Sequence, residues 1–182
     1  MPIRAIGSDG EGWSFVVAEA IRDAVDAGAS VINLSLSVPC RSRVLEEALN
    51  YAEERGAVVF TAAGNDGVLN PQVFPARYDT AAGVAATDPA DARAPFSNYG
   101  NAIVSLAAPG TAIYSPWRVG GLFAWMDGTS QATALASGVA ALVRSATPAA
   151  SRDQVLDAML RSAQRLPDSN MGSGRVDAFA AV

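Results

Sequence analysis

The sequence predicts an α/β protein built on a mostly parallel sheet flanked by helices. Buried strands and amphipathic helices alternate over the first sixty or so residues, and the segments between strands are long enough to hold a helix. Strands joined in this way pair in parallel through right-handed crossovers. The 182 residues are 50% hydrophobic and 17% charged, which is typical of a globular chain with one sizeable core. No linker or repeat interrupts the pattern, so we expect residues 1–182 to form a single domain.

The first half of the chain supplies most of the expected sheet. Short apolar runs predict strands, and apolar residues spaced three and four apart predict helices. We expect strands at Pro2–Ile6, Val31–Leu36 and Ala57–Ala62, and helices at Ser14–Ala27 and Ser42–Arg55. Gly28 and Gly56 follow the two helices, where a residue with positive φ is favoured.

The second half changes character between Val68 and Trp125, where Pro and Gly separate short apolar runs. Within it, Thr80–Ala85 and Ile103–Ala107 predict two further strands joined by long loops. The last third is helical. We expect helices at Ser130–Ser145 and Ser151–Ala163, followed by a polar segment and a short terminal helix.

Composition excludes several classes of function. The formal net charge is −5, whereas nucleic-acid binding requires a basic surface, so no nucleic-acid partner is expected. No apolar run approaches the roughly 20 residues that span a bilayer, and no signal peptide is visible at the N-terminus. The single cysteine, Cys40, allows no internal disulfide. These features leave the localisation open.

Gly128-Thr129-Ser130 is the best candidate for a catalytic centre, because it immediately precedes an apolar helix. A serine at a helix N-terminus lies where free N–H groups and the helix dipole favour developing negative charge. In acyl transfer that charge forms on the carbonyl oxygen of the tetrahedral intermediate. The commoner role of Thr or Ser at a helix start is that of an N-cap, and the local sequence by itself favours capping.

Two segments that follow predicted strands are further candidates. Asn65, within Ala62-Ala63-Gly64-Asn65-Asp66-Gly67, offers a neutral N–H donor at the edge where open α/β sheets bind ligands. Ser35-Leu36-Ser37 could present backbone groups to an extended peptide. Taken alone, the first segment is more simply a turn and the second an ordinary strand end.

Together these motifs resemble the subtilisin-like serine proteases, the subtilase family. GTSQATALASG, from Gly128 to Gly138, is similar to the family's nucleophile motif, and AAGND is similar to its oxyanion motif. VINLSLS resembles the strand that lines the substrate cleft, and RAIGSDGEG resembles the strand and turn after the family's His motif. Further segments resemble the family in its order: FPARYDT, FSNYG, AAPG and GSGRVDAFAAV. The likeness covers essentially the whole chain.

The resemblance implies a three-layer subtilisin-like fold and a serine endopeptidase that acts through an acyl-enzyme. Ser130 maps onto the nucleophile, and Asn65 maps onto the side-chain donor of the oxyanion hole. A protein or peptide substrate would contact the positions that match the family's cleft: Ser35, Leu36, Ser37, Thr61, Ala62, Ala63, Gly64, Gly128 and Thr129. No cofactor is implied. Family members are often secreted and often bind structural calcium, but no carboxylate cluster in this sequence identifies a metal site.

The family's catalytic Asp and His lie upstream of the first residue of this chain, so the resemblance implies a partial catalytic domain that lacks its N-terminal part. All thirteen basic residues are Arg, and without His or Lys no residue here is a usual base for Ser130. We therefore expect the 182 residues alone to be inactive. Glu19 and Asp23 have the spacing of the carboxylates in the related sedolisins, but sedolisins carry an oxyanion Asp where this chain has Asn65.

Three explanations of this pattern stay open. The chain is a fragment of an active protease, one piece of a split enzyme completed by a segment bearing Asp and His, or a pseudoprotease that binds peptides without hydrolysis. Intact Ser130 and Asn65 argue against the last. A nucleotide-binding protein is a weaker alternative, because the loop 7–12 carries two carboxylates where phosphates would bind. We also expect an exposed sheet edge to make the isolated chain poorly soluble or marginally stable.

Overall fold

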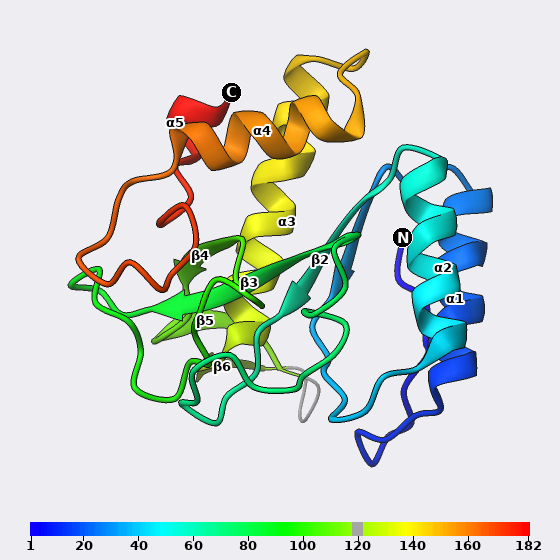
Figure 1. Cartoon of the computed structure of the whole chain (residues 1–182), viewed down its shortest axis with the longest axis horizontal. Coiled ribbons are helices and arrows are strands. Elements are labelled where there is room, and N and C mark those ends of the chain that lie inside the picture. The colour runs from blue at the N-terminus through cyan, green and yellow to red at the C-terminus, as the bar shows by residue number, and fades with distance from the viewer. Residues whose placement is uncertain (118–121) are drawn as a thin grey trace.

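The computed structural model describes residues 1–117 and 122–182 (Figure 1). From residue 14 onward, helices and strands alternate in the expected order through the first half, and helices dominate the last third. In chain order the elements are α1 (Ser14–Asp26), β1 (Val31–Leu34), α2 (Arg43–Glu54), β2 (Val58–Ala62), β3 (Ala81–Thr87), β4 (Leu106–Pro109), β5 (Ile113–Pro116), β6 (Phe123–Met126), α3 (Thr129–Ala146), α4 (Arg152–Ser162) and α5 (Ala178–Ala181).

Four parallel strands form the main sheet in the order β1-β2-β3-β4, which confirms the predicted α/β fold. Since all four strands run the same way, their carboxyl ends lie at one edge of the sheet. β1 ends at Leu34 and β2 ends at Ala62. The segments that carry Ser35 and Asn65 therefore leave the sheet side by side, at the edge where open α/β sheets bind ligands.

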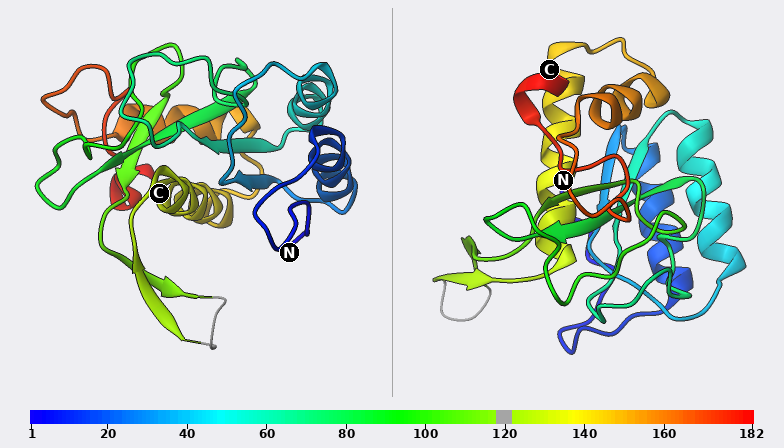
Figure 2. Two further views of the ribbon diagram at one scale, coloured as in Figure 1. Left: turned by 90° about the horizontal axis from the view of Figure 1, so that it is seen from below. Right: turned by 60° about the vertical axis from the view of Figure 1, so that its left-hand side comes forward.

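Helices cover both faces of this sheet, which gives the chain three layers (Figure 2). The side chains of a strand point alternately to opposite faces. In β2, Val59 packs in the cluster formed by α1 and α2, whereas Val58 and Phe60 pack in the cluster formed by α3, α4 and α5. Every residue of β2 is buried, so this strand forms the centre of the core.

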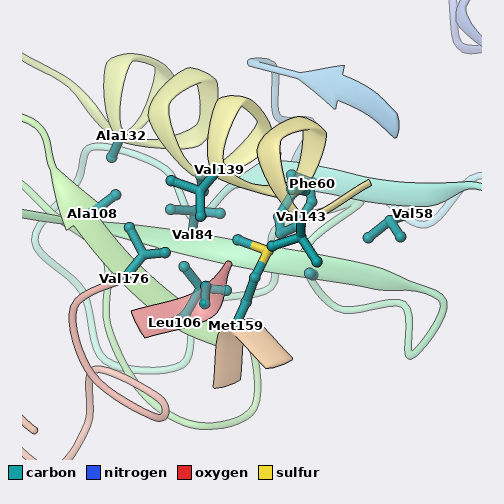
Figure 3. Close-up of a cluster of buried hydrophobic side chains, with 14 of the residues drawn as sticks. Val58, Phe60, Val84, Leu106, Ala108, Ala132, Val139, Val143, Met159 and Val176 are labelled. Atoms are coloured by element: carbon teal, nitrogen blue, oxygen red, sulfur yellow. The ribbon is translucent and has the colours of Figure 1, made fainter. Parts of the chain in front are cut away.

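Helix α3 lies close against the sheet because its inner face carries small side chains. Ala132, Ala136 and Ala140 recur every four residues, and all three are fully buried. Larger side chains fill the space between α3 and the sheet, as Figure 3 shows for Phe60, Val84, Leu106, Val139, Val143 and Met159. Since Ser130 lies in the first turn of α3, the close packing of this helix also fixes the position of Ser130 relative to the sheet.

The strand predicted at Pro2–Ile6 does not form. A strand needs a hydrogen-bonded neighbour, and among the described residues none pairs with this segment. Instead a pocket of about 650 Å³ separates it from β1, lined by residues 1–6 on one side and by β1 and α1 on the others. The predicted extended segment is thus present without the pairing that would make it a strand.

The strand predicted at Ile103–Ala107 begins later, at Leu106. The N–H groups of Ile103 and Val104 both donate to the Gly100 carbonyl in a turn. Their side chains are buried in a small cluster that includes Met171. The apolar run therefore predicted burial correctly, but only its last two residues, Leu106 and Ala107, enter the sheet.

An antiparallel hairpin of β5 and β6 has no counterpart among the strands expected from the sequence. Tyr114 pairs with Trp125 in its register, and Pro116 pairs with Phe123. The two strands extend away from the body of the molecule (Figure 2). Both aromatic residues of the central pair are largely exposed, so this ribbon lacks the buried face from which strands are normally recognised.

Candidate active site

Ser130 is the second residue of α3, and its hydroxyl points toward the end of β1. Ser130 Oγ donates to the Ser35 carbonyl at 3.3 Å, and Ser35 Oγ donates in return to the Ser130 carbonyl at 2.8 Å. Gly128 occupies the N-cap position and has no side chain with which to cap the helix. Neither Thr129 nor Ser130 is the N-cap that local sequence favoured, and Ser130 is half-buried at the rim of a pocket.

Asn65 caps the start of α3 from a distant loop. Its Oδ1 accepts hydrogen bonds from both the N–H and the hydroxyl of Thr129, each at 2.9 Å. Thr129 Oγ1 in turn accepts the Gly64 N–H at 3.2 Å. Because Oδ1 accepts two hydrogen bonds, the orientation of the Asn65 amide is fixed. Its Nδ2, on an exposed side chain, donates to no other described residue and so remains available as a donor.

Most of the predicted site residues line one pocket of about 670 Å³. It lies between the 10–12 loop, the end of β1 and the start of α3, and the predicted residues that line it are Ser35, Leu36, Ser37, Ala62, Gly64, Asn65, Thr129 and Ser130. The structure places Thr61, Ala63 and Gly128 beneath this surface, where they are buried. Thr61 supports the pocket from below, since its hydroxyl donates to the Leu36 carbonyl at 3.5 Å.

Ionisable side chains are scarce at this pocket. Among the described residues that line it, only Glu11 carries a titratable side chain. Glu19 and Asp23 are located on α1 and do not line the pocket. The sequence has no His. The carboxylate pair considered from sequence spacing therefore does not line the pocket of Ser130, whereas Glu11 does.

Sequence reasoning missed Asn98 as a part of the site. This side chain is fully buried beneath the loop that carries Asn65. The segment FSNYG resembles a family segment, but nothing in its local pattern indicates a buried amide. A polar residue in a segment of short runs broken by Pro and Gly is usually exposed, so only the tertiary contacts identify Asn98.

The chemistry available here is the stabilisation of negative charge next to a hydroxyl group. The N–H of Ser130 lies in the first turn of α3, where the helix itself provides no acceptor. The positive end of the helix dipole further stabilises negative charge near this N–H, and Asn65 Nδ2 supplies a second donor. Ser130 and Asn65 line one pocket at the carboxyl edge of a parallel sheet, a combination of groups that suits acyl transfer in a serine hydrolase.

Comparison with known proteins narrows this class. The sequence matches the Subtilase family over residues 1–177, and the chain belongs to that family. It is 39% identical to Subtilisin BL of Lederbergia lenta over 181 residues, which cover 99% of this chain and 66% of the relative. Thermitase of Thermoactinomyces vulgaris is 39% identical over 184 residues, which cover 100% of this chain and 64% of the relative. The resemblance inferred from the motifs is confirmed.

Solved structures agree with the sequence relatives. A protease from Pseudoalteromonas arctica matches with a TM-score of 0.92 and 31% identity, covering 100% of this chain and 61% of that one. A lanthipeptide protease matches with a TM-score of 0.89 and 25% identity, covering 99% and 68%. The fold is therefore the subtilisin-like fold. The chain spans about half to two thirds of the length of the curated relatives it matches.

Two further findings concern metals and membranes. In the part of the chain that the structure describes, no three His, Cys, Asp or Glu side chains gather in a way that could hold a metal ion. Across residues 1–117 and 122–182, no helix has the length and apolar character needed to cross a membrane.

Proposed function

We propose that this chain supplies the nucleophile and the oxyanion hole of a serine endopeptidase, and that its 182 residues alone do not hydrolyse peptides. The observation that carries the proposal is the convergence of Ser130 and Asn65, from a helix start and a distant loop, on one pocket. A binding module would need neither a hydroxyl nor a free amide donor at this position.

In the proposed reaction Ser130 Oγ attacks the carbonyl carbon of the scissile bond while a base takes the hydroxyl proton. A C–O bond forms, and the resulting oxyanion accepts hydrogen bonds from Asn65 Nδ2 and from the Ser130 N–H. Collapse of this intermediate breaks the C–N bond, and the amine leaves with the proton that the base returns. Water then releases the acyl group by the same steps.

The resting hydroxyl is not yet aimed at a substrate. Ser130 Oγ donates to the Ser35 carbonyl, so this hydrogen bond must be exchanged for one to the base before attack. The peptide would lie in extended form along residues 35–37, with Ala62 and Gly64 at the primary specificity pocket. Thr61 and Ala63 are buried, so they would shape that pocket from beneath.

The proposal assigns the base to another segment. The chain has no His or Lys, and a triad serine without its His is a poor nucleophile. In subtilisin, a relative of this chain, loss of the triad lowers kcat by about 2 × 10⁶. A segment that bears Asp and His, from the same polypeptide or from another, would restore the missing groups.

A site for such a segment lies beside β1. This strand pairs only with β2 among the described residues, and the 650 Å³ pocket follows its other edge. Edge strands accept further strands by main-chain pairing. A strand inserted in parallel would end at the same sheet edge as β1, beside Ser35, so a residue directly after it would reach the neighbourhood of Ser130.

The test is labelling of the purified chain by a fluorophosphonate, which reacts with activated serines. We expect no labelling of the chain alone. Labelling is expected once the N-terminal third of a relative, bearing Asp and His, is added. Ser130→Ala should abolish that labelling, whereas Ser14→Ala, a serine that lines the same pocket, should preserve it.

Two results would contradict the proposal. Labelling of the chain alone at Ser130 would mean that a base lies within the chain, and Glu11→Gln would then identify or exclude the acid at the pocket. Binding of the added segment without any labelling would favour the pseudoprotease instead.

A further inference from the structure

The carboxamide of Asn98 lies at the centre of the loop that carries Asn65. Asn98 follows β3 in a long connection and is fully buried. Its own N–H donates to the Gly64 carbonyl at 2.9 Å. A buried polar side chain is costly unless all its hydrogen-bonding groups are satisfied. The hydrogen-bond partners of the Asn98 side chain therefore indicate its role.

The side chain of Asn98 uses its complete hydrogen-bonding capacity on the 63–68 loop. Its Oδ1 accepts the N–H groups of Asp66 at 3.1 Å and of Val68 at 3.0 Å. Its Nδ2 donates to the Ala63 carbonyl at 2.9 Å and to Asp66 Oδ2 at 3.2 Å. A carboxamide has two donors and two principal acceptor sites, and all four bonds here go to residues on either side of Asn65.

The loop wraps so tightly around this amide that position 64 has no room for a side chain. A Cβ built at Gly64 would collide with Asn98 Nδ2, and Gly64 has a φ of +97°, which other residues rarely adopt. Asn is the residue that places a planar carboxamide, with two donor and two acceptor sites, at this short distance from the backbone. The substitution Asn98→Asp would set a carboxylate oxygen against the Ala63 carbonyl and Asp66, and a serine is too short to reach both sides.

We propose that Asn98 is the positioning residue of the oxyanion donor: it holds the 63–68 loop in the one conformation that presents Asn65 Nδ2 to the pocket. This inference rests on the proposed role of Asn65. Asn98 touches no substrate, and it acts from below the loop. Thr129 fixes the amide of Asn65 from one side, and Asn98 fixes the backbone that carries it.

The first test needs no activity. In ¹⁵N-labelled chain, Asn98→Ala should accelerate amide exchange of Asp66 and Val68 by about 10- to 100-fold, since each loses its acceptor. The side-chain amide signals of Asn65 should move toward random-coil positions. Val155→Ala is the control, because Val155 is fully buried in α4 and does not contact the loop. It should lower the global stability, but the Asp66 and Val68 amides should exchange no faster than the rest of the core, and the Asn65 side-chain signals should stay in place.

Should Asn98→Ala fail to fold, Asn98→Asp keeps the shape and is tested in the same way. It should loosen the loop, and adding Asp66→Asn should recover part of the protection because an N–H donor then faces the new carboxylate. Unchanged Asn65 signals together with unchanged exchange at Asp66 and Val68 would overturn the inference.

The second test uses the fluorophosphonate with the complementing segment. Asn65→Ala should slow labelling about 10²- to 10³-fold, as loss of an oxyanion donor does. Asn98→Ala should slow it by up to the same factor, and the double variant should be no slower than Asn65→Ala alone. Additive effects would show that Asn98 does not act through Asn65. If the wild-type pair is not labelled at all, the proposed function fails, and the amide-exchange test still decides the role of Asn98.

Discussion

Thr129 links the loop of Asn65 to the helix of Ser130, and its hydroxyl can be removed with little change in shape. Thr129 is fully buried. Its hydroxyl accepts the N–H of Gly64 and donates to Asn65 Oδ1. Thr129→Val replaces that hydroxyl by a methyl group, so the N–H of Gly64 loses its acceptor and Asn65 Oδ1 keeps only the Thr129 N–H.

The expected cost follows from these two losses. A buried donor without a partner costs about 1–3 kcal/mol, and a lost hydrogen bond between neutral groups costs about 0.5–1.5 kcal/mol. We therefore expect Thr129→Val to lower the free energy of unfolding by about 2–4 kcal/mol. Thr133→Val is the matched control one turn along α3. The Thr133 hydroxyl only donates to the Thr129 carbonyl, which retains its helical N–H partner, so about 1 kcal/mol or less is expected.

Urea unfolding followed by circular dichroism measures both variants against the parent chain, with the slope m checked for constancy. Sucrose at one fixed concentration keeps a marginally stable chain folded in all samples. If Thr129→Val costs no more than Thr133→Val, the Gly64 N–H does not depend on Thr129, and the reasoning that links the 63–68 loop to the start of α3 is wrong.

Two further predictions concern the sheet and the acid range. A Cβ at Gly83 would overlap the Ile103 carbonyl, whereas a Cβ at Gly138 would meet nothing within 4 Å. Gly83→Ala should therefore lower the free energy of unfolding by about 3 kcal/mol or more. Gly138→Ala, within α3, should raise it by about 0.5–1 kcal/mol. Opposite shifts of the two urea midpoints check this pair, and equal shifts would contradict it. The backbone N–H of Asn170 holds the pKa of Asp168 below its ordinary 3.8, so this carboxylate stabilises the folded state above that value and loses its effect as the pH falls through the lower folded-state pKa. Asp168→Asn should lower stability at pH 7 and flatten the loss of stability below about pH 4; a parent-like slope between about pH 2 and 5 in urea midpoints would argue against it.

Local periodicity accounts for the elements that the sequence predicted well. Helix α1 has apolar residues every three to four positions, and β2 is a short run buried on both faces, so each carries its own signal. Segments whose structure depends on pairing with another strand were predicted poorly. Residues 2–6 are extended in pattern but have no strand beside them, and the ribbon of β5 and β6 exposes its aromatic residues, so neither pattern matches its structure.

The candidate site shows the same division. Sequence order alone placed Ser130 at a helix start and Asn65 after a strand, and the motifs around them identified the family, because these are local features of the chain. What the hydroxyl of Ser130 does was decided only in three dimensions. Asn65 Oδ1, from a loop more than sixty residues earlier in the chain, accepts the Thr129 N–H and so caps the helix, which leaves the serine without a capping role.

Local patterns in the chain were therefore enough to predict most of the helices, the inner strands, the family and the residues able to do chemistry. Which of them come together depended on the tertiary structure: Thr61 and Ala63 lie beneath the pocket, Glu11 rather than Glu19 lines it together with Ser130, and Asn98 lies under the 63–68 loop. The reason is physical. A periodic pattern records which side of an element is buried, but a hydrogen bond between segments dozens of residues apart depends on strand order and loop path, which no local pattern records.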